Sequence, residues 1–173
     1  MQVQCFLQDS SKGDNIVRTF ARGCQGRLVK TYDFVNNPKL DSSPVFLWGC
    51  LRGSDAVLRH CWQTNHTFYY ADNCYYGDKK FFRITKNAVQ NTVFAQRPND
   101  RLAANPIRLQ PWRRSGSDIV ILPPTESFGH LFQKQQWLEQ TIAELKQYTN
   151  RPIRVRYKPG RSEEHTSELQ SHH

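Results

Sequence analysis

Acidic residues are scarce in this sequence, and long apolar runs are absent. Its 173 residues include 15 Asp and Glu against 24 Lys and Arg, which gives a net charge of +9. No segment approaches the roughly 18 consecutive apolar residues that a membrane-spanning helix needs. The first residues, MQVQCFLQD, have neither a basic start nor a long apolar run, so they do not resemble a signal peptide. We therefore expect a cytoplasmic protein with no membrane partner.

Cysteine is present but lacks the pattern of a disulfide framework. The five cysteines are an odd number without paired short spacings, namely Cys5, Cys24, Cys50, Cys61 and Cys74. The apolar neighbours of Cys5 and Cys50 predict reduced thiols in the core. The spacing of Cys61, His66 and Cys74 matches no standard zinc site. We expect no metal and no cofactor other than a bound substrate.

The end of the sequence differs from the rest. Residues 161–172, RSEEHTSELQSH, resemble a translated sequencing-library adapter, and a natural polar terminus is the alternative. We expect residues 161–173 to be a non-native, disordered tail on an incomplete protein. Without it, 23 basic and 12 acidic residues remain, a net charge of +11. Such a charge favours an anionic partner, either a nucleotide-sugar or a nucleic acid.

Apolar strands alternate with amphipathic helical patterns in the first part of the chain. Strands are expected at residues 3–7, 27–32, 44–51, 67–71 and 81–85, with helices after the first and third. Asp14 or Asn15 is the expected N-cap of the first helix. The nearly continuous apolar run 44–51 is typical of a strand covered on both faces of a parallel sheet. This alternation predicts an α/β, Rossmann-like domain with a parallel sheet over residues 1–110.

A second α/β unit is expected after a linker at residues 111–117. Its pattern is a strand at 118–122, a loop at 125–130, a helix at 137–148 and a strand at 153–158. Two strands and one helix bury too little surface to be stable alone. We therefore expect residues 118–160 to be the truncated start of a second Rossmann-like domain.

Several segments resemble an uncharacterised protein family of tailed phages and prophages. They are LRG at 51–53, FYYAD at 68–72, YG at 76–77, FRITKN at 82–87, ILPP at 121–124 and NRPIRVRYKP at 150–159. The later part is also distantly similar to the second domain of two-Rossmann (GT-B) glycosyltransferases. The resemblance implies a GT-B-type fold and nucleotide-sugar-dependent glycosyl transfer in a host cytoplasm, with this fragment itself expected to be inactive.

Candidate phosphate-binding residues follow two of the expected strands. They are Ser10, Ser11, Lys12 and Gly13 after the first strand, and Arg52 and Ser54 after the third. Loops at the carboxyl ends of parallel strands form the ligand crevice in open α/β folds, and helix N-termini favour anions. Ordinary capped connections are the alternative.

An aromatic and basic segment supplies further candidates. Asp72, at the end of a strand, is the candidate catalytic base or polar anchor. Arg83 and Lys86 are candidate phosphate partners, with neighbouring aromatic rings stacking on a sugar or base. The alternative is that the aromatic rings belong to the core and the cations are solvated.

The second unit carries its own candidates, by similarity to a donor-phosphate loop. Thr125 and Ser127 are expected to bind phosphate oxygens, and Glu126 a ribose hydroxyl. Lys158, at the carboxyl end of the last strand, is a further phosphate partner, with a plain basic edge strand as the alternative. A basic nucleic-acid-binding phage protein and a non-catalytic structural or interaction protein are the alternative functions.

Overall fold

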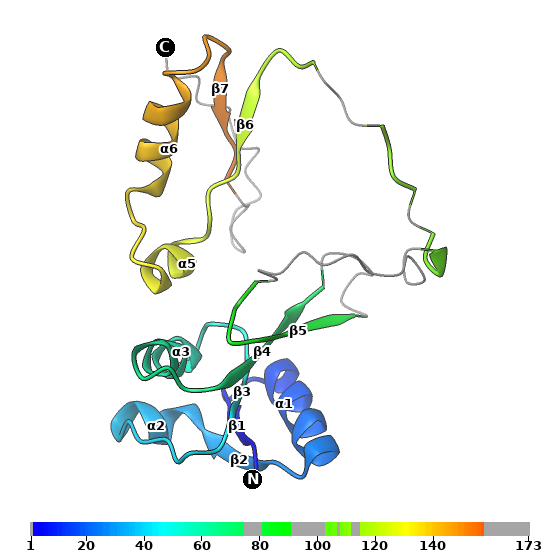
Figure 1. The fold of residues 1–173 in the computed structure, drawn as a ribbon, viewed down its shortest axis with the longest axis vertical. Helices are drawn as coiled ribbons and strands as arrows, with labels where there is room; N and C mark the ends of the chain where they lie inside the picture. The colour runs from blue at the N-terminus through cyan, green and yellow to red at the C-terminus, as the bar shows by residue number, and fades with distance from the viewer. Residues whose placement is uncertain (1, 75–80, 91–102, 107, 112–114, 158–173) are drawn as a thin grey trace. The chain divides into compact units, whose positions relative to one another are not determined.

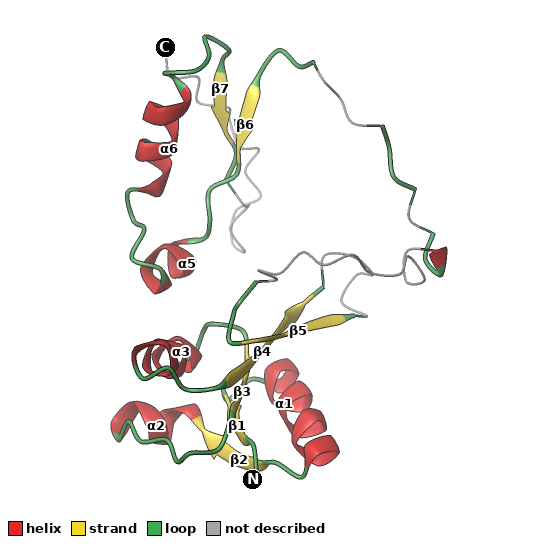
Figure 2. Cartoon of the chain, viewed as in Figure 1, coloured by secondary structure: helices red, strands yellow, loops and turns green. Residues whose placement is uncertain are grey.

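The computed structural model describes residues 2–74, 81–90, 103–106, 108–111 and 115–157, and Figures 1 and 2 show their arrangement. The chain divides into two compact units, residues 1–95 and 96–173. The predicted linker falls partly, and the predicted non-native tail wholly, outside the described residues, so both stay predictions.

Unit 1 is built around a five-stranded sheet. Its elements are β1 (Gln4–Leu7), α1 (Ser11–Cys24), β2 (Arg27–Lys30), α2 (Thr31–Asn36), β3 (Val45–Trp48), α3 (Ser54–Gln63), β4 (Phe68–Asn73) and β5 (Phe82–Lys86). The strand order is β2-β1-β3-β4-β5. The first four strands are parallel, and β5 is antiparallel to β4. The predicted α/β class is confirmed in this mostly parallel sheet.

The antiparallel β5 corrects the expectation of a wholly parallel sheet. Residues 74–81 join β4 to β5. A parallel crossover needs a dozen or more residues, usually with a helix, whereas antiparallel neighbours need only a short connection. Strand β5 is antiparallel accordingly, and it begins beside the carboxyl end of β4.

Helices cover both faces of the sheet of unit 1. Figure 1 shows α1 on one side and α2 and α3 on the other. On the α1 side, buried residues form a cluster of Cys5, Leu7, Val17, Ala21, Phe46, Trp48 and Ala71. On the other side, Phe6 makes an edge contact with Phe34 of α2, with ring centroids 5.8 Å apart. The apolar strands β1 and β3 are buried along their whole length, as expected for central strands.

Two local predictions are wrong. The N-cap of α1 is Ser10, whose hydroxyl accepts a hydrogen bond from the Gly13 amide at 3.2 Å. Asp14 lies in the first turn instead, where its carboxylate accepts from the Gln8 amide. The expected strand over 27–32 ends at Lys30, and α2 follows. Burial of Thr31 and Phe34, three residues apart, gives this segment a helical period.

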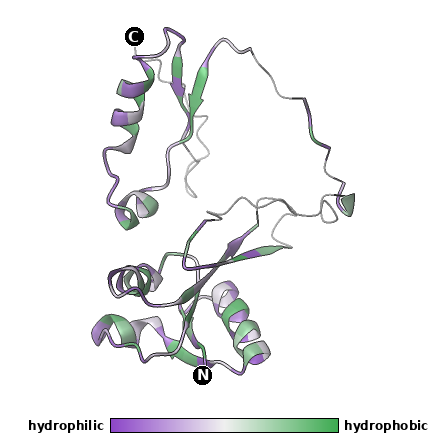
Figure 3. Ribbon diagram, viewed as in Figure 1, coloured by the Kyte–Doolittle hydropathy of each residue, from purple (hydrophilic) through white to green (hydrophobic). Residues whose placement is uncertain are grey.

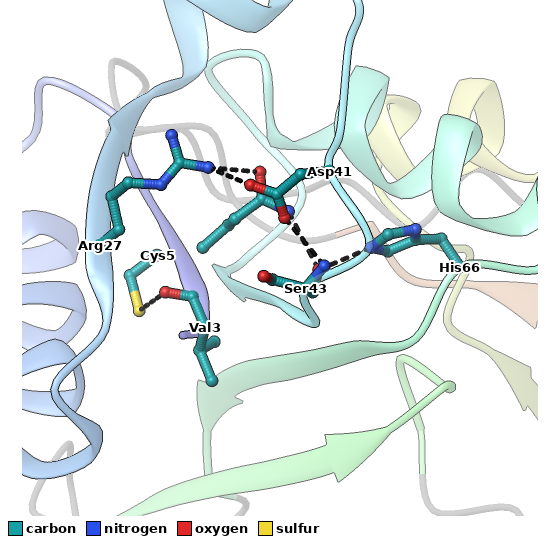
Figure 4. A network of polar contacts seen from close by, with 7 residues as sticks. Val3, Cys5, Arg27, Asp41, Ser43 and His66 are labelled. Atoms are coloured by element: carbon teal, nitrogen blue, oxygen red, sulfur yellow. Dashed lines mark hydrogen bonds and ion pairs between the residues drawn. The ribbon is translucent and has the colours of Figure 1, made fainter. Parts of the chain in front are cut away.

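A polar network connects the amino end of the edge strand β2 to the loops before β3 and β4 (Figure 4). Arg27 pairs with Asp41 at 2.6 Å, and Asp41 also accepts from the Ser43 amide at 2.8 Å. His66 Nε2 lies 2.8 Å from the Ser43 carbonyl oxygen. Hydrogen bonds from the backbone and from the side chain of Ser43 lower the pKa of the Asp41 carboxyl, and the backbone bond has the larger effect. This network holds the loop before β3 against β1 and β2.

Burial explains the state of the cysteines. All five thiols are free; Cys5, Cys50 and Cys61 are buried, and Cys24 is exposed. Burial raises the pKa of Cys5 and of Cys61 to about 12, and it also raises the pKa of Cys50. The prediction of reduced core thiols is confirmed for Cys5 and Cys50.

We expect the thiols to separate by reactivity. At pH 8 a thiol of pKa about 12 is thiolate in only about one molecule in ten thousand, and the thiolate is the nucleophile. Ellman's reagent added to the native protein should label Cys24 rapidly and the three buried cysteines only after unfolding. Because the folded pKa values are raised, stability should fall as pH rises above about 9. Titration in guanidinium should count all five thiols. Rapid reaction of all five in the native protein would show that the three cysteines are not buried.

Unit 2 contains a smaller parallel sheet. Its elements are β6 (Ile119–Ile121), α5 (Glu126–Leu131), α6 (Trp137–Leu145) and β7 (Ile153–Val155). Strands β6 and β7 pair in parallel, with Ile119 opposite Ile153. Figure 3 shows hydrophilic and hydrophobic residues mixed along α6, as its amphipathic pattern predicts. The expected loop at 125–130 is mostly helical, as α5. In the described segments, no helix combines the length and apolar character that crossing a membrane requires.

Candidate functional site

The strand order of unit 1 defines one candidate edge. Strand β1 lies between β2 and β3. The chain leaves β1 through α1 toward β2 and then passes through α2 to β3, so the connections after β1 and β3 diverge. Ligands of open α/β sheets bind at such a switch point, outside the carboxyl ends of the strands. The loops there are residues 8–10 and 49–53.

Gln8 joins the two loops at this edge. Its buried side-chain amide donates to the Trp48 carbonyl and to the Ser54 hydroxyl. A Cβ added at Gly13 would lie 2.8 Å from Cδ1 of Trp48. Glycine at this position therefore lets the first turn of α1 approach β3 closely. Ser54 is fully buried, so its hydroxyl serves this internal contact.

Unusual backbone conformations gather in the same two loops. Asp9 has a φ of 52° and Arg52 a φ of 57°, and both Gly49 and Gly53 also have positive φ. Positive φ is uncommon for a residue such as arginine, and strained residues cluster at binding sites. The Arg52 guanidinium donates to the Asp9 carbonyl oxygen at 3.4 Å, and this contact connects the loops across the edge.

Lys12, on the first turn of α1, contacts side chains of β3, β4 and β5. Its ammonium donates to Oδ1 of Asn73 at 2.8 Å. It also lies 5.3 Å from the ring centroid of Trp48 and 5.7 Å from that of Phe82, within cation–π range. The two rings meet edge to face at 5.4 Å. Sequence reasoning selected Lys12 but missed Trp48, although Trp48 occupies the carboxyl end of an expected strand.

Asp72 is held by neighbours on β4 and β5. Its Oδ2 lies 3.3 Å from both the Tyr70 hydroxyl and Nη2 of Arg83. Its side chain keeps 27% exposure, against 15% for Arg83. Burial and the adjacent Asp72 raise the pKa of the Tyr70 hydroxyl, which therefore stays protonated and donates to this carboxylate. Asp72 thus has the contacts of a polar anchor, with part of the carboxylate open to solvent.

The structure does not bring every candidate of unit 1 to this edge. Because β5 is antiparallel, Phe82 lies opposite Asn73 and Lys86 lies opposite Tyr69. Lys86 is therefore near the amino end of β4, whereas Arg83 is near the carboxyl end. Ser11 is exposed on the first turn of α1.

Unit 2 has a pocket at the carboxyl ends of its own strands. This cavity of about 710 Å³ is lined by the connection after β6, by α5, by the connection to α6 and its start, and by Tyr157, two residues after β7. The predicted loop residues Thr125 and Glu126 line it, whereas Ser127 does not. Lys158 lies outside the described residues. The pocket does not identify a ligand, but it brings polar groups together where parallel strands end.

Aromatic and charged side chains line the pocket of unit 2 together. Trp137 and Tyr157 supply rings, and Lys134 supplies a cation. Glu126 Oε1 lies 3.5 Å from Nε2 of His130, one helical turn away. Rings stack on sugars and bases, while the cation suits a phosphate. Sequence reasoning missed Trp137 as a site residue because its helical spacing indicated a packing role.

The geometry of these two sites carries the functional argument. No group of three His, Cys, Asp or Glu side chains in the described ranges is arranged to hold a metal ion. No protein family, curated protein or solved structure matches the chain.

Proposed function

We propose that the protein binds a nucleotide-sugar and takes part in glycosyl transfer. The observation that carries this proposal is the pocket of unit 2. It lies at the carboxyl ends of parallel strands and includes Thr125 and Glu126 of the predicted donor loop, with Trp137 and Tyr157 beside them. A nucleotide-sugar offers a ring to stack, hydroxyls to hydrogen-bond and phosphates to pair with Lys134.

Unit 1 holds the candidate base of this proposal. Its carboxyl edge presents Lys12, Arg52 and the partly exposed carboxylate of Asp72. The acceptor oxygen attacks the sugar carbon, and the bond from that carbon to the phosphate oxygen breaks. Asp72 receives the proton of the acceptor hydroxyl, and basic side chains neutralise the departing phosphate. The similarity to tailed-phage proteins and to GT-B transferases is part of the same proposal.

Donor binding tests this proposal without requiring turnover. Titration calorimetry with UDP- and CMP-sugars should detect saturable binding to this chain. Trp137→Ala should weaken it about 5- to 150-fold, because one stacking contact contributes about 1–3 kcal/mol. Tyr148→Ala is the matched control, since this ring is 79% exposed and does not line the pocket. Equal affinity in both variants would exclude the pocket, and no binding would leave an interaction protein as the better description.

A second candidate function is nucleic-acid binding, favoured by the net charge of +9. Phosphate-backbone binding releases counterions, so its affinity falls steeply with salt. A steep salt dependence with oligonucleotides, together with no response to any nucleotide-sugar, would favour this function over glycosyl transfer.

A further inference from the structure

A surface groove of unit 1 lies away from the carboxyl edge. It has a volume of about 760 Å³ and runs between the exposed side of α1 and the edge strand β2. Its lining includes Asn15, Arg18, Thr19 and Arg22 of α1 and Leu28 of β2. None of these residues belongs to either candidate site, so the groove is a separate feature with a role of its own to explain.

The charge of this groove has one sign. Among the described residues that line it, Arg18 and Arg22 are the only charged ones. They stand one turn apart on α1, where like charges on neighbouring helical positions repel. Both are exposed. A helix that keeps two such cations side by side gains from an anion that neutralises both.

Four other arginines of the described residues differ from this pair, because each forms an ion pair. Four ion pairs join an arginine to an aspartate, and they are Arg27–Asp41, Arg59–Asp55, Arg83–Asp72 and Arg154–Asp118. Within the described part of the chain, no carboxylate forms an ion pair with Arg18 or Arg22. Their guanidinium groups therefore remain available to an external anion.

We propose that the groove between α1 and β2 binds the phosphate backbone of a double-stranded nucleic acid. The planar guanidinium fork matches phosphate oxygens in two-point contacts. The neutral side-chain amide of Asn15 suits a further phosphate or sugar contact, whereas the Thr19 hydroxyl donates to the Asn15 carbonyl oxygen at 2.7 Å. None of the described residues that line the groove is aromatic, so they offer no surface on which the bases of a single strand would stack.

This inference rests on the second candidate function and is independent of glycosyl transfer. It adds a place and a mode of recognition: two phosphates held by Arg18 and Arg22, without readout of base sequence. The overall charge of +9 draws the polyanion toward the protein, and the groove holds it.

The salt dependence of binding tests the groove directly. Fluorescence anisotropy with two labelled DNA duplexes of different sequence should give equal affinities that fall as salt rises. Each phosphate contact contributes about 0.9 to the slope of log affinity against log salt. The double variant R18Q/R22Q should therefore reduce the slope by about 2. A K39Q/K146Q variant, which removes the same charge at exposed positions outside the groove, should keep the parent slope.

Each other outcome overturns the proposal. If duplexes bind but both double variants keep the parent slope, the groove is not the binding surface, and the second candidate function survives elsewhere. If no duplex binds at low salt, both fail. If polyglutamate competes as well as unlabelled duplex, the groove binds any polyanion and not a phosphate backbone. A thermal unfolding midpoint of R18Q/R22Q at or above that of the parent protein shows that the variant is folded.

Discussion

Replacing Trp48 by alanine lowers the free energy of unfolding of unit 1 by about 3–5 kcal/mol. The ring is only 9% exposed and belongs to the core cluster under α1. It also meets the ring of Phe82 edge to face and lies beneath the ammonium of Lys12. Its removal leaves a cavity and withdraws contacts that join α1, β3 and β5 at the carboxyl edge.

Urea unfolding followed by far-ultraviolet circular dichroism measures this effect. Trp48→Phe is the control, because a smaller ring keeps part of the packing and of the cation–π contact. It should be less destabilising than alanine. A loss below about 1 kcal/mol for Trp48→Ala would mean that the ring does not fill the space between Gly13 and Phe82.

Replacing Phe46 by alanine has an effect of similar size on stability and leaves the carboxyl edge without a direct change. Phe46 is fully buried, and its ring stacks on Phe20 of α1 with centroids 3.7 Å apart and planes 5° apart. Loss of a buried phenylalanine costs about 3–5 kcal/mol. The aromatic pair also stabilises the packing of α1 against the sheet.

The midpoint of urea unfolding again gives the result for Phe46→Ala. Tyr32→Ala is the matched control, since that ring is 68% exposed and should change the free energy of unfolding by no more than about 0.5 kcal/mol. Equal midpoints for the two variants would contradict the placement of Phe46 at the centre of the core.

The sequence predicts the fold well where apolar patterns are continuous. The run 44–51 indicates a doubly covered strand, and β3 is buried on both faces. Prediction from the sequence fails where tertiary contacts decide the local structure. Asp14 has the chemistry of an N-cap, but Ser10 occupies that position, while the Asp14 carboxylate accepts from Gln8. Aspartate and serine are about equally favoured as N-caps, so this preference alone does not distinguish the two residues.

The candidate site is predictable in part for the same reason. Lys12 and Asp72 are selected by their positions after strands, which chain order supplies. The contact of Lys12 with Trp48 depends on the pairing of β1 with β3, which only the sheet order reveals. Lys86 lies away from the carboxyl edge because β5 is antiparallel, and a local pattern carries no strand direction.

The pocket of unit 2 is the centre of the functional account, and a single titration tests it most directly. Amide chemical shifts of the isotope-labelled protein are recorded while a UDP- or CMP-sugar is added. We predict saturable shifts at Thr125, Gly129 and His130 and at the indole of Trp137, all of which line the pocket. Absence of shifts with every nucleotide-sugar, or shifts confined to unit 1, would contradict the proposed donor site.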